Sequence, residues 1–485
     1  MNFLKVFHIF LFHLFSIYMA NANTYPIQDY GAKGDGITDN TQIIQDVINK
    51  CSESGGGKVI FDSGVYMSGR IDLKSNITIE LRQNAVWKGI ADTSAAVYAD
   101  VKEEFIFESN RAFIFAKGQE NIKITGVGTI HGNGQNHDVF VPGVGVLRRN
   151  RPYGIYFWNC KNIVVEGIKI QNTAFWAQRY FECDNLTIRN IQVYNHSNMN
   201  NDGLDIVDCH RVMISNCLID SEDDALCFKS ESDYGVEDVV VSNCIFSSHA
   251  SAIKFGTASS GYFNRINISN CIIKPSLERT THHPYQLTNG VRGILLLATD
   301  GATLENITIS NIIMDGVLSP ITARIGDRNR VWRPEIEGNR KTIKKPIFRG
   351  VEISDIKAVN VGSVGSSIIG QSDNYISNFT LRDIEIYLRE EGSDGDEIEI
   401  KASQKHGFLS KAKNLPAYGL YVKHANNMDI RNFKVHSTRK DIPEFCLCFD
   451  KVNGAYIEGT KFFHPTIKPK RLVQIVNSLD IDFKQ

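Results

Sequence analysis

One segment recurs along the chain, as NIVVEGIKI (162–170), NLTIRNIQV (185–193), RVMISNCLI (211–219), DVVVSNCIF (238–246) and RINISNCII (265–273). The starts of these copies are 23, 26, 27 and 27 residues apart. Apolar and polar residues alternate within each copy, which is the period-two pattern of a β-strand, and a small corner interrupts it. A strand pattern repeated at this interval predicts a solenoid, in which each repeat buries its apolar face against its neighbours.

Further copies extend the repeat in both directions, as NITIELRQN (76–84), NIKITGVGT (121–129), NITISNIIM (306–314) and NFTLRDIEI (378–386). Helical solenoids need an apolar stripe with a period of 3.6 residues, which these segments lack. The sequence therefore predicts an all-β fold, a solenoid of parallel coils stacked about 4.8 Å apart. Residues one repeat apart then become neighbours in space.

Two residue types recur at fixed places in the repeat. Asparagine begins six of the nine copies and predicts a ladder of stacked side-chain amides at a corner, for example at Asn162, Asn185, Asn306 and Asn378. Cysteine also recurs at matching places, at Cys160, Cys183, Cys209, Cys217, Cys244 and Cys271. We expect these thiols to be mostly free core residues rather than disulfides. The pattern leaves Cys446 and Cys448 undecided.

The two ends of the repeat region have distinct signals. An amphipathic helix is predicted after Asp39, the expected N-cap, with Gln42 three residues on and Gly55 to Gly57 ending it. This helix would cover the open end of the first coil. Residues 387–417 are highly charged and break the repeat, so we expect a surface insertion within a single domain that spans 23–485.

Residues 1–22 have the pattern of a secretory signal peptide. Lys5 precedes an apolar run, and Ala20-Asn21-Ala22 fits the small-x-small cleavage rule. We expect Sec-type export to the periplasm or the cell exterior. No later stretch is long and apolar enough to span a bilayer. The formal net charge is −1, so the chain lacks the basic field that would attract nucleic acid.

The stretch SEDDALCFKS (221–230) places three acids directly before an apolar run. Asp202 precedes Asp223 by 21 residues, close to one coil. Stacking would therefore bring Asp202, Asp223 and Asp224 onto one outer patch, provided that a bend turns both members of the pair outward. Glycoside hydrolysis needs one protonated and one ionised carboxyl group, and clustered acids supply both. The residues alone do not assign the roles.

The neighbouring acids have simpler interpretations. Glu222 is expected to be a solvated neighbour of the pair, because exposed charge is the default. Asp205 and Asp208 alternate along one strand and are expected to be ladder or corner residues.

Several ordered segments resemble glycoside hydrolase family 28, which includes polygalacturonases and rhamnogalacturonan hydrolases. They are the N-terminal block from about residue 25, GTIHGNG (128–134), TAFWAQRYFECDNLTIRNI (173–191), NNDGLDIVDCHRVMISNCLIDSEDDALCFKS (200–230) and NGVRGI (289–294). The resemblance implies a right-handed parallel β-helix and an inverting hydrolase that acts on an acidic, pectin-like polysaccharide or its oligosaccharides. It also implies that Asp223 is the general acid and that Asp202 and Asp224 position and deprotonate water.

Four further residues are candidates for substrate binding. Asn200 begins the family's Asn-x-Asp motif, and His249 is the nearest match to the histidine of a motif that is otherwise not cleanly kept. Arg292 matches the arginine of the family's Arg-x-Lys, but Ile294 stands where the lysine would be. Lys254 lies one coil after the acid pair and could supply a cation for a sugar carboxylate. We expect a monomer with a uronic-acid-containing substrate, no metal ion and no cofactor.

Other readings remain open on the sequence. The same fold could carry a calcium-dependent polysaccharide lyase, with the acids as metal ligands. It could also be a non-catalytic β-helix that binds glycans, since a fold does not determine a function. Phe175 and Trp176 match a family Phe-Trp, but they could equally form a sugar platform or pack in the core.

Overall fold

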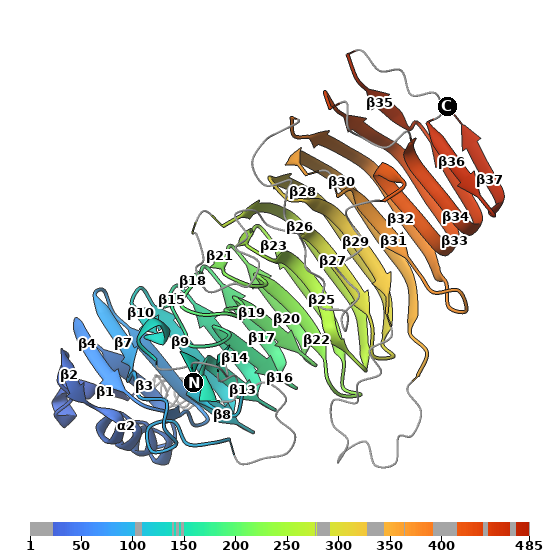
Figure 1. The fold of residues 1–485 in the computed structure, drawn as a ribbon. Helices are drawn as coiled ribbons and strands as arrows, with labels where there is room; N and C mark the ends of the chain where they lie inside the picture. The colour runs from blue at the N-terminus through green and yellow to red at the C-terminus, as the bar shows by residue number, and fades with distance from the viewer. Residues whose placement is uncertain are drawn as a thin grey trace, which may run out of the picture.

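The computed structural model describes residues 23–101, 109–137, 140–141, 145–146, 150–276, 278, 292–326, 344–362, 364–390, 415–439, 445–465 and 472–484. Strands wind coil upon coil along one axis, from the N-terminal helix to the C-terminal strands (Figure 1). This confirms the predicted right-handed parallel β-helix. The predicted signal peptide (1–22) lies outside the described residues, as does 391–414 of the predicted insertion.

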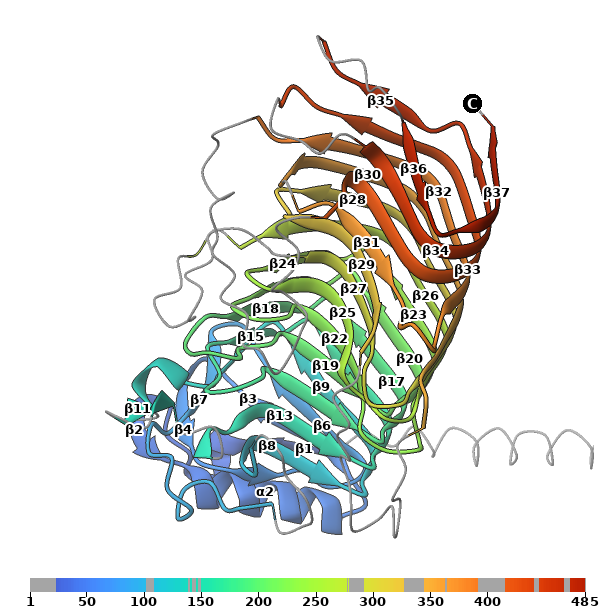
Figure 2. The same ribbon diagram turned by 45° about the vertical axis from the view of Figure 1, so that its right-hand side comes forward.

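Parallel pairing builds three long sheets, which the two views show as faces of one coil (Figures 1 and 2). Sheet 1 consists of β5 (Ile71–Asp72), β8 (Ala112–Lys117), β13 (Tyr153–Trp158), β16 (Gln178–Phe181), β19 (Leu204–Val207), β22 (Leu226–Ser230), β25 (Ser251–Ser259), β27 (Arg292–Ala298), β29 (Ser319–Ile325), β31 (Ser366–Ile369), the first parts of β33 (Ala417–His436) and β34 (Phe445–Glu458), and β36 (Val473–Val476).

Sheet 2 consists of β1 (Thr24–Pro26), β3 (Gly57–Phe61), β6 (Ile77–Leu81), β9 (Glu120–Gly126), β14 (Lys161–Glu166), β17 (Asp184–Arg189), β20 (His210–Ser215), β23 (Val236–Ser242), β26 (Tyr262–Pro275), β28 (Thr303–Asp315), β30 (Ile347–Val361), β32 (Ile376–Leu388), later parts of β33 and β34, and β37 (Leu479–Lys484). The copies quoted above lie on this sheet and lead into the next.

Sheet 3 consists of β2 (Asp35–Asp39), β4 (Gly64–Ser68), β7 (Ala85–Gly89), β10 (Thr129–His131), β15 (Lys169–Gln171), β18 (Gln192–Asn195), β21 (Leu218–Ser221), β24 (Ile245–Ser248), the last parts of β26, β28, β30, β32 and β33, and β35 (Lys461–Phe463). Short elements outside the three sheets are the antiparallel pair β11 (Phe140–Val141) and β12 (Gly145–Val146), and the 3₁₀ helices η1 (Ile27–Tyr30) and η2 (Gly134–Asn136).

The apolar core runs through the middle of the coil. One of its columns passes along sheet 2 in register, through Ile163, Leu186, Val212, Val239 and Ile266. All five side chains are buried. Each residue packs on the equivalent residue of the next coil, which is the contact that the sequence repeat predicts.

The predicted asparagine ladder is present where several sheet 2 strands begin, although Arg211, Asp238 and Arg265 take the place of asparagine on β20, β23 and β26. The side-chain amide of Asn162 donates to Oδ1 of Asn121 at 2.9 Å, and Asn185 donates to Oδ1 of Asn162 at 2.8 Å. Their φ angles are +55° and +56°, in the left-handed region that asparagine tolerates better than most residues. Asn306 and Asn378 take part in equivalent amide pairs with Asn264 and Asn427.

The predicted capping helix is α2, Thr41–Glu53, which covers the first coils at the N-terminal end (Figure 1). Its N-cap is Asn40 rather than Asp39, so that part of the prediction was wrong. Asp39 is the last residue of β2 and pairs with Met67, which keeps its backbone in the sheet. Its carboxylate still accepts from the Thr41 amide at 2.8 Å.

The ten cysteines are all free and buried, including Cys446 and Cys448. This confirms the interpretation of the recurrent cysteines as core residues. Among the residues that the structure describes, no helix combines the length and the apolar character needed to cross a bilayer.

Candidate active site

The three aspartates lie in two consecutive corners that lead from sheet 3 into sheet 1. Asp202 lies between β18 and β19, and Asp223 and Asp224 lie between β21 and β22. Leu204 pairs with Leu226, and the Gly203 amide donates to the Asp224 carbonyl at 2.9 Å. The coil therefore measures 22 residues here, and Asp202 stacks on Asp224 rather than on Asp223.

The structure brings the three predicted carboxyl groups together. Carboxylate oxygens of Asp202 and Asp224 lie within 4.8 Å of each other and of the Cys227 Sγ. The charge of Asp223 acts on both of them. The expected bend is also present, because the chain turns at Glu222 and Asp223 before β22 begins at Leu226.

Asp223 is the least buried of the three and is held by a neutral group. The side-chain amide of Asn200 donates to its Oδ2 at 3.1 Å. Asn200 is itself held by Arg151, whose Nη2 donates to the amide oxygen at 3.2 Å. Arg151 is fully buried, and its guanidinium lies 4.3 Å from the ring centroid of Phe175. Asn200, predicted to contact substrate, thus lies where it orients Asp223.

Asp202 is held by a buried lysine. The ammonium of Lys229 lies 3.2 Å from Oδ2 of Asp202 and also contacts Oδ1 of Asp205. The same ammonium lies 3.7 Å from the ring centroid of Trp176, which adds a cation–π contact. Asp205 is therefore a buried ion-pair partner of Lys229 and not the ladder or corner residue that its position predicts.

Asp224 is held by a second lysine. The ammonium of Lys254 lies 2.5 Å from its Oδ2, as expected for a cation placed one coil after the acid pair. Burial alone would lower the pKa of Lys254, but the charge of Asp224 outweighs it and raises the pKa. The three acids thus have three different partners: an amide for Asp223, and one ammonium each for Asp202 and Asp224.

Burial dominates the electrostatics of the two inner carboxyl groups. It raises the pKa of Asp202 well above its usual range, and Asp205 adds to this rise while Lys229 opposes it. Burial also raises the pKa of Asp224, against the opposing charge of Lys254. These aspartates therefore ionise at higher pH than an exposed aspartate does, which is the kind of pKa shift that acid–base catalysis uses.

Glu222 corrects one prediction. It was expected to be solvated, but its side chain is fully buried. It points under the corner, where the Asn201 amide donates to Oε2 at 3.4 Å. Burial raises the pKa of Glu222 to about 9, and the charge of Asp223 adds to the rise. Glu222 is thus a neutral acid at pH 7. The default of exposed charge failed because the bend turns this residue inward.

Asp208 is the corner residue that was predicted. Its two carboxylate oxygens accept hydrogen bonds from the Ser230 hydroxyl and from the Glu231 and Gly235 amides. Burial raises the pKa of Asp208 to about 7.

His249 lies one coil beyond Glu222 and is fully buried. Its ring packs edge to face on His196 at a centroid separation of 5.7 Å. His196 in turn pairs with Asp220 at 2.9 Å. Burial raises the pKa of Asp220, but hydrogen bonds from His196 and Ser276 lower it overall. Contact between His249 and substrate remains a prediction.

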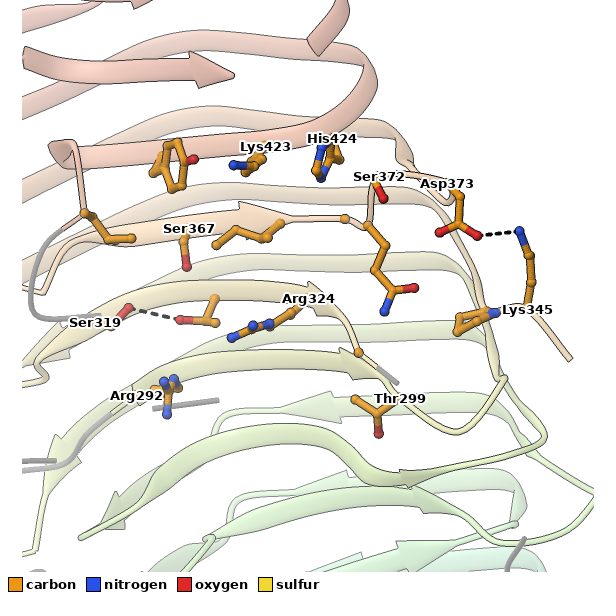
Figure 3. A pocket seen from close by; sticks show the side chains of 18 of the residues that line it. Arg292, Thr299, Ser319, Arg324, Lys345, Ser367, Ser372, Asp373, Lys423 and His424 are labelled. Carbon is orange, nitrogen blue, oxygen red and sulfur yellow. Dashed lines mark hydrogen bonds and ion pairs between the residues drawn. The ribbon is translucent and has the colours of Figure 1, made fainter. Parts of the chain in front are cut away.

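Arg292 begins β27 and lies in the wall of a cavity of about 750 Å³ on the outer face of sheet 1 (Figure 3). Burial lowers the pKa of Arg292 to about 10, Arg324 adds to this, and Asp224 opposes it. Ile294 is fully buried in the inward column with Ile253 and Ile321. The position that lacks the family's lysine thus faces the core.

Phe175 and Trp176 pack in a second apolar cluster and are not an exposed sugar platform. Both are buried, their rings stack at 5.2 Å, and Tyr153 lies against each of them. The cluster lies on the outer side of sheet 1, on the coils before the acids. Trp176 nevertheless contributes to the site, because the Lys229 ammonium packs on its ring.

Sequence reasoning missed Lys229 and Arg324. A signal for Lys229 was available, since Leu226 and Phe228 are apolar and strand alternation directs Cys227 and Lys229 to the opposite face. Arg324 lies in no quoted copy and matches no motif, so only the coil register reveals that it shares a cavity with Arg292.

The residues around Asp202 and Asp224 are a poor fit to a calcium site. Two carboxylates and a thiol lie close enough to share an ion, but two ammonium groups already provide the counter-charge. Calcium prefers six to eight oxygen ligands, and a thiol is a soft one. The arrangement therefore favours acid–base chemistry over the lyase alternative.

Solved structures of other proteins share this fold. The solved exopolygalacturonase of Thermotoga maritima is 23% identical, with a TM-score of 0.61 over 76% of this chain and 87% of that one. The family 28 exopolygalacturonase of Yersinia enterocolitica is 17% identical, with a TM-score of 0.63 over 95% of this chain and 78% of that one. At these identities the likeness establishes the β-helix fold alone.

Sequence relatives are more informative about family. A probable polygalacturonase of Vitis vinifera is 28% identical over 236 residues, covering 46% of this chain and 48% of the relative. An exo-poly-alpha-D-galacturonosidase of Dickeya chrysanthemi is 26% identical over 252 residues, covering 42% and 41%. The chain thus spans about half the length of these relatives or less. The model of glycosyl hydrolases family 28 matches residues 51–404. Since that range is most of the sequence, the chain belongs to glycosyl hydrolases family 28.

Proposed function

We propose that this protein is an inverting glycoside hydrolase that cleaves a uronic-acid-containing, pectin-like polysaccharide or its oligosaccharides. The observation that carries the proposal is the convergence of Asp202, Asp223 and Asp224 from two consecutive coils, each with its own partner. The names of the sequence relatives support an acidic sugar as the substrate. Export through the N-terminal segment would place the enzyme where such a polymer is found.

In the proposed reaction, Asp223 donates its proton to the glycosidic oxygen as the bond from that oxygen to the anomeric carbon breaks. A water molecule attacks the anomeric carbon from the opposite face, and its proton passes to Asp202 or Asp224. The ammonium groups of Lys229 and Lys254 favour the ionised forms that can accept this proton. Half-exposed Asp223 and its neutral amide partner suit the group that meets the leaving oxygen.

Replacing Asp223 with Asn tests the proposal. Loss of the general acid should reduce the release of reducing sugar from polygalacturonate by about a hundredfold or more. Circular dichroism and thermal unfolding should match the parent protein, because the amide keeps the size of the side chain. The matched control is Asp238→Asn, since exposed Asp238 lies on sheet 2 and pairs with exposed Arg265 at 2.6 Å. Unchanged turnover in Asp223→Asn would reject the assignment.

A further inference from the structure

The cavity of about 750 Å³ lies on the outer face of sheet 1, on the coils that follow the acids (Figure 3). It is walled by β27, β29, β31 and the start of β33, which are consecutive rungs of that sheet. Arg292 lies at one edge of the cavity and pairs with Ser251 at the start of β25. The same strand carries Lys254, which contacts Asp224. The cavity therefore continues the active site in the C-terminal direction.

The register defines two outward columns that run into this cavity. One column passes from Lys254, the partner of Asp224, through Leu295, Thr322 and Ser367 to Tyr421. The other column includes Arg324 and Lys423, separated by Ile369. At about 4.8 Å per rung, the backbones of Arg324 and Lys423 lie roughly 10 Å apart along the axis. A short oligosaccharide can span such a length.

The cavity carries an excess of positive charge. Among the lining residues that the structure describes, the basic side chains are Arg292, Arg324, Lys344, Lys345, Lys423 and His424, and the one carboxylate is Asp373. Asp373 already pairs with Lys345 at 2.7 Å. Lys423 pairs with Asp450, outside the lining, at 2.8 Å. The wall nearest the acids is thus dominated by the two arginines.

Arg292 and Arg324 are two like charges in a partly buried space. Figure 3 shows both guanidinium groups on the cavity wall, from neighbouring strands. Burial lowers the pKa of Arg324, and Arg292 is affected by burial and by Arg324 as noted above. A carboxylate has the charge opposite to both groups and matches the planar fork of a guanidinium.

The rest of the lining suits a sugar. Hydroxyl groups of Ser319, Thr322, Ser367 and Tyr421 face the same space as the arginines. Ser319 and Thr322 bond to each other at 3.0 Å, and such exchangeable hydroxyl pairs can rearrange to meet hydroxyl groups of a ligand.

We propose that Arg324 holds a sugar carboxylate within this cavity and is a specificity-determining residue for uronate substrates. The inference rests on the proposed function, since it names the groups that the same site recognises. It adds a residue that no sequence motif marks, contributed by the coil after that of Arg292.

The first test compares Arg324→Gln with the parent enzyme on polygalacturonate and on the same polymer with its carboxylates methyl-esterified. The variant should raise KM for polygalacturonate roughly tenfold, the loss expected for one charge-assisted contact, with a smaller change in kcat. Its KM for the esterified polymer should stay within about twofold, and Arg324→Lys should recover part of the loss. The control is Arg382→Gln, because exposed Arg382 pairs with Glu352 on sheet 2.

A second measurement separates this inference from the proposed function. Calorimetric binding of trigalacturonate to Asp223→Asn, with and without Arg324→Gln, reports recognition without turnover. A roughly tenfold weaker affinity in the double variant supports the role of Arg324, even if the parent enzyme proves to hydrolyse nothing. Equal affinities in the two variants would overturn the role of Arg324 even if hydrolysis is observed. An equal increase in KM on both polymers would overturn it as well.

Discussion

The contact between Lys254 and Asp224 links a single side chain to the chemistry. Asp224 must be ionised to accept a proton from water, yet burial favours its neutral form. The ammonium at 2.5 Å opposes that effect. Lys254 thus helps to set the pH at which the site becomes competent, besides any contact that it makes with substrate.

Replacing Lys254 with Met removes the opposing charge and keeps most of the side-chain volume. The pKa of Asp224 then rises further, so a smaller fraction of Asp224 is ionised at any given acidic pH. The acidic limb of the profile of kcat/KM against pH should move to higher pH by about one unit or more. Lys254→Arg keeps the charge and should leave the limb near its original place. An unmoved limb in Lys254→Met would exclude this role.

At the level of residues, the sequence identified the three aspartates because the repeat length makes them neighbours. It misaligned them by one position, since the local coil has 22 residues and the spacing of 21 favoured Asp223 as the partner of Asp202. It misjudged Glu222 because the position of the bend decides which side chains turn inward. A period in the sequence does not locate that bend.

At the level of elements, the asparagine ladder stabilises the corner where sheet 2 strands such as β14 and β17 begin. Asn162 combines a left-handed backbone with side-chain hydrogen bonds to the coils on both sides. The element therefore couples local conformation to stacking.

Two substitutions of Asn162 separate these contributions. Asn162→Gly removes both side-chain hydrogen bonds but tolerates the positive φ. Asn162→Ala removes the same hydrogen bonds and also places an alanine in the left-handed region. Alanine should lower the free energy of unfolding by about 2 kcal/mol and by more than glycine does. Denaturant unfolding followed by circular dichroism measures the difference, with Lys161→Ala, an exposed neighbour, as control. A glycine variant less stable than the alanine variant would contradict this explanation.

The elements themselves followed from the sequence where the pattern is strong. The copies between 162 and 273 are strands of sheet 2 that lead into sheet 3, as their alternation predicts. The strands of sheet 1 gave a weaker signal, because β13, β16 and β19 are buried on both faces and do not alternate. The N-cap of α2 moved by one residue because the pairing of β2 extends to Asp39.

At the level of the whole molecule, the outer face of sheet 1 is asymmetric about the acids. On the coils before them, Tyr153, Phe175 and Trp176 are buried side chains of the second apolar cluster. On the coils after them lies the open, cationic cavity. Among the described residues, the acids therefore have packed aromatic side chains on one side and a cavity on the other.

This asymmetry predicts attack near chain ends. Reducing sugar should rise from the start of digestion of polygalacturonate while the viscosity of the solution falls slowly, and chromatography should show short oligosaccharides from the earliest times. A rapid fall in viscosity at a low yield of reducing ends would instead require a groove that is open on both sides of the acids.

The most direct measurement follows reducing ends and ultraviolet absorbance together in one digestion of polygalacturonate, with and without EDTA. Hydrolysis by Asp202, Asp223 and Asp224 predicts that reducing ends accumulate without a rise in absorbance, and that EDTA changes nothing. A rise in absorbance from unsaturated products that EDTA abolishes would show elimination at a metal site. Saturable binding with no product of either kind would show that the aspartates do not catalyse cleavage at all.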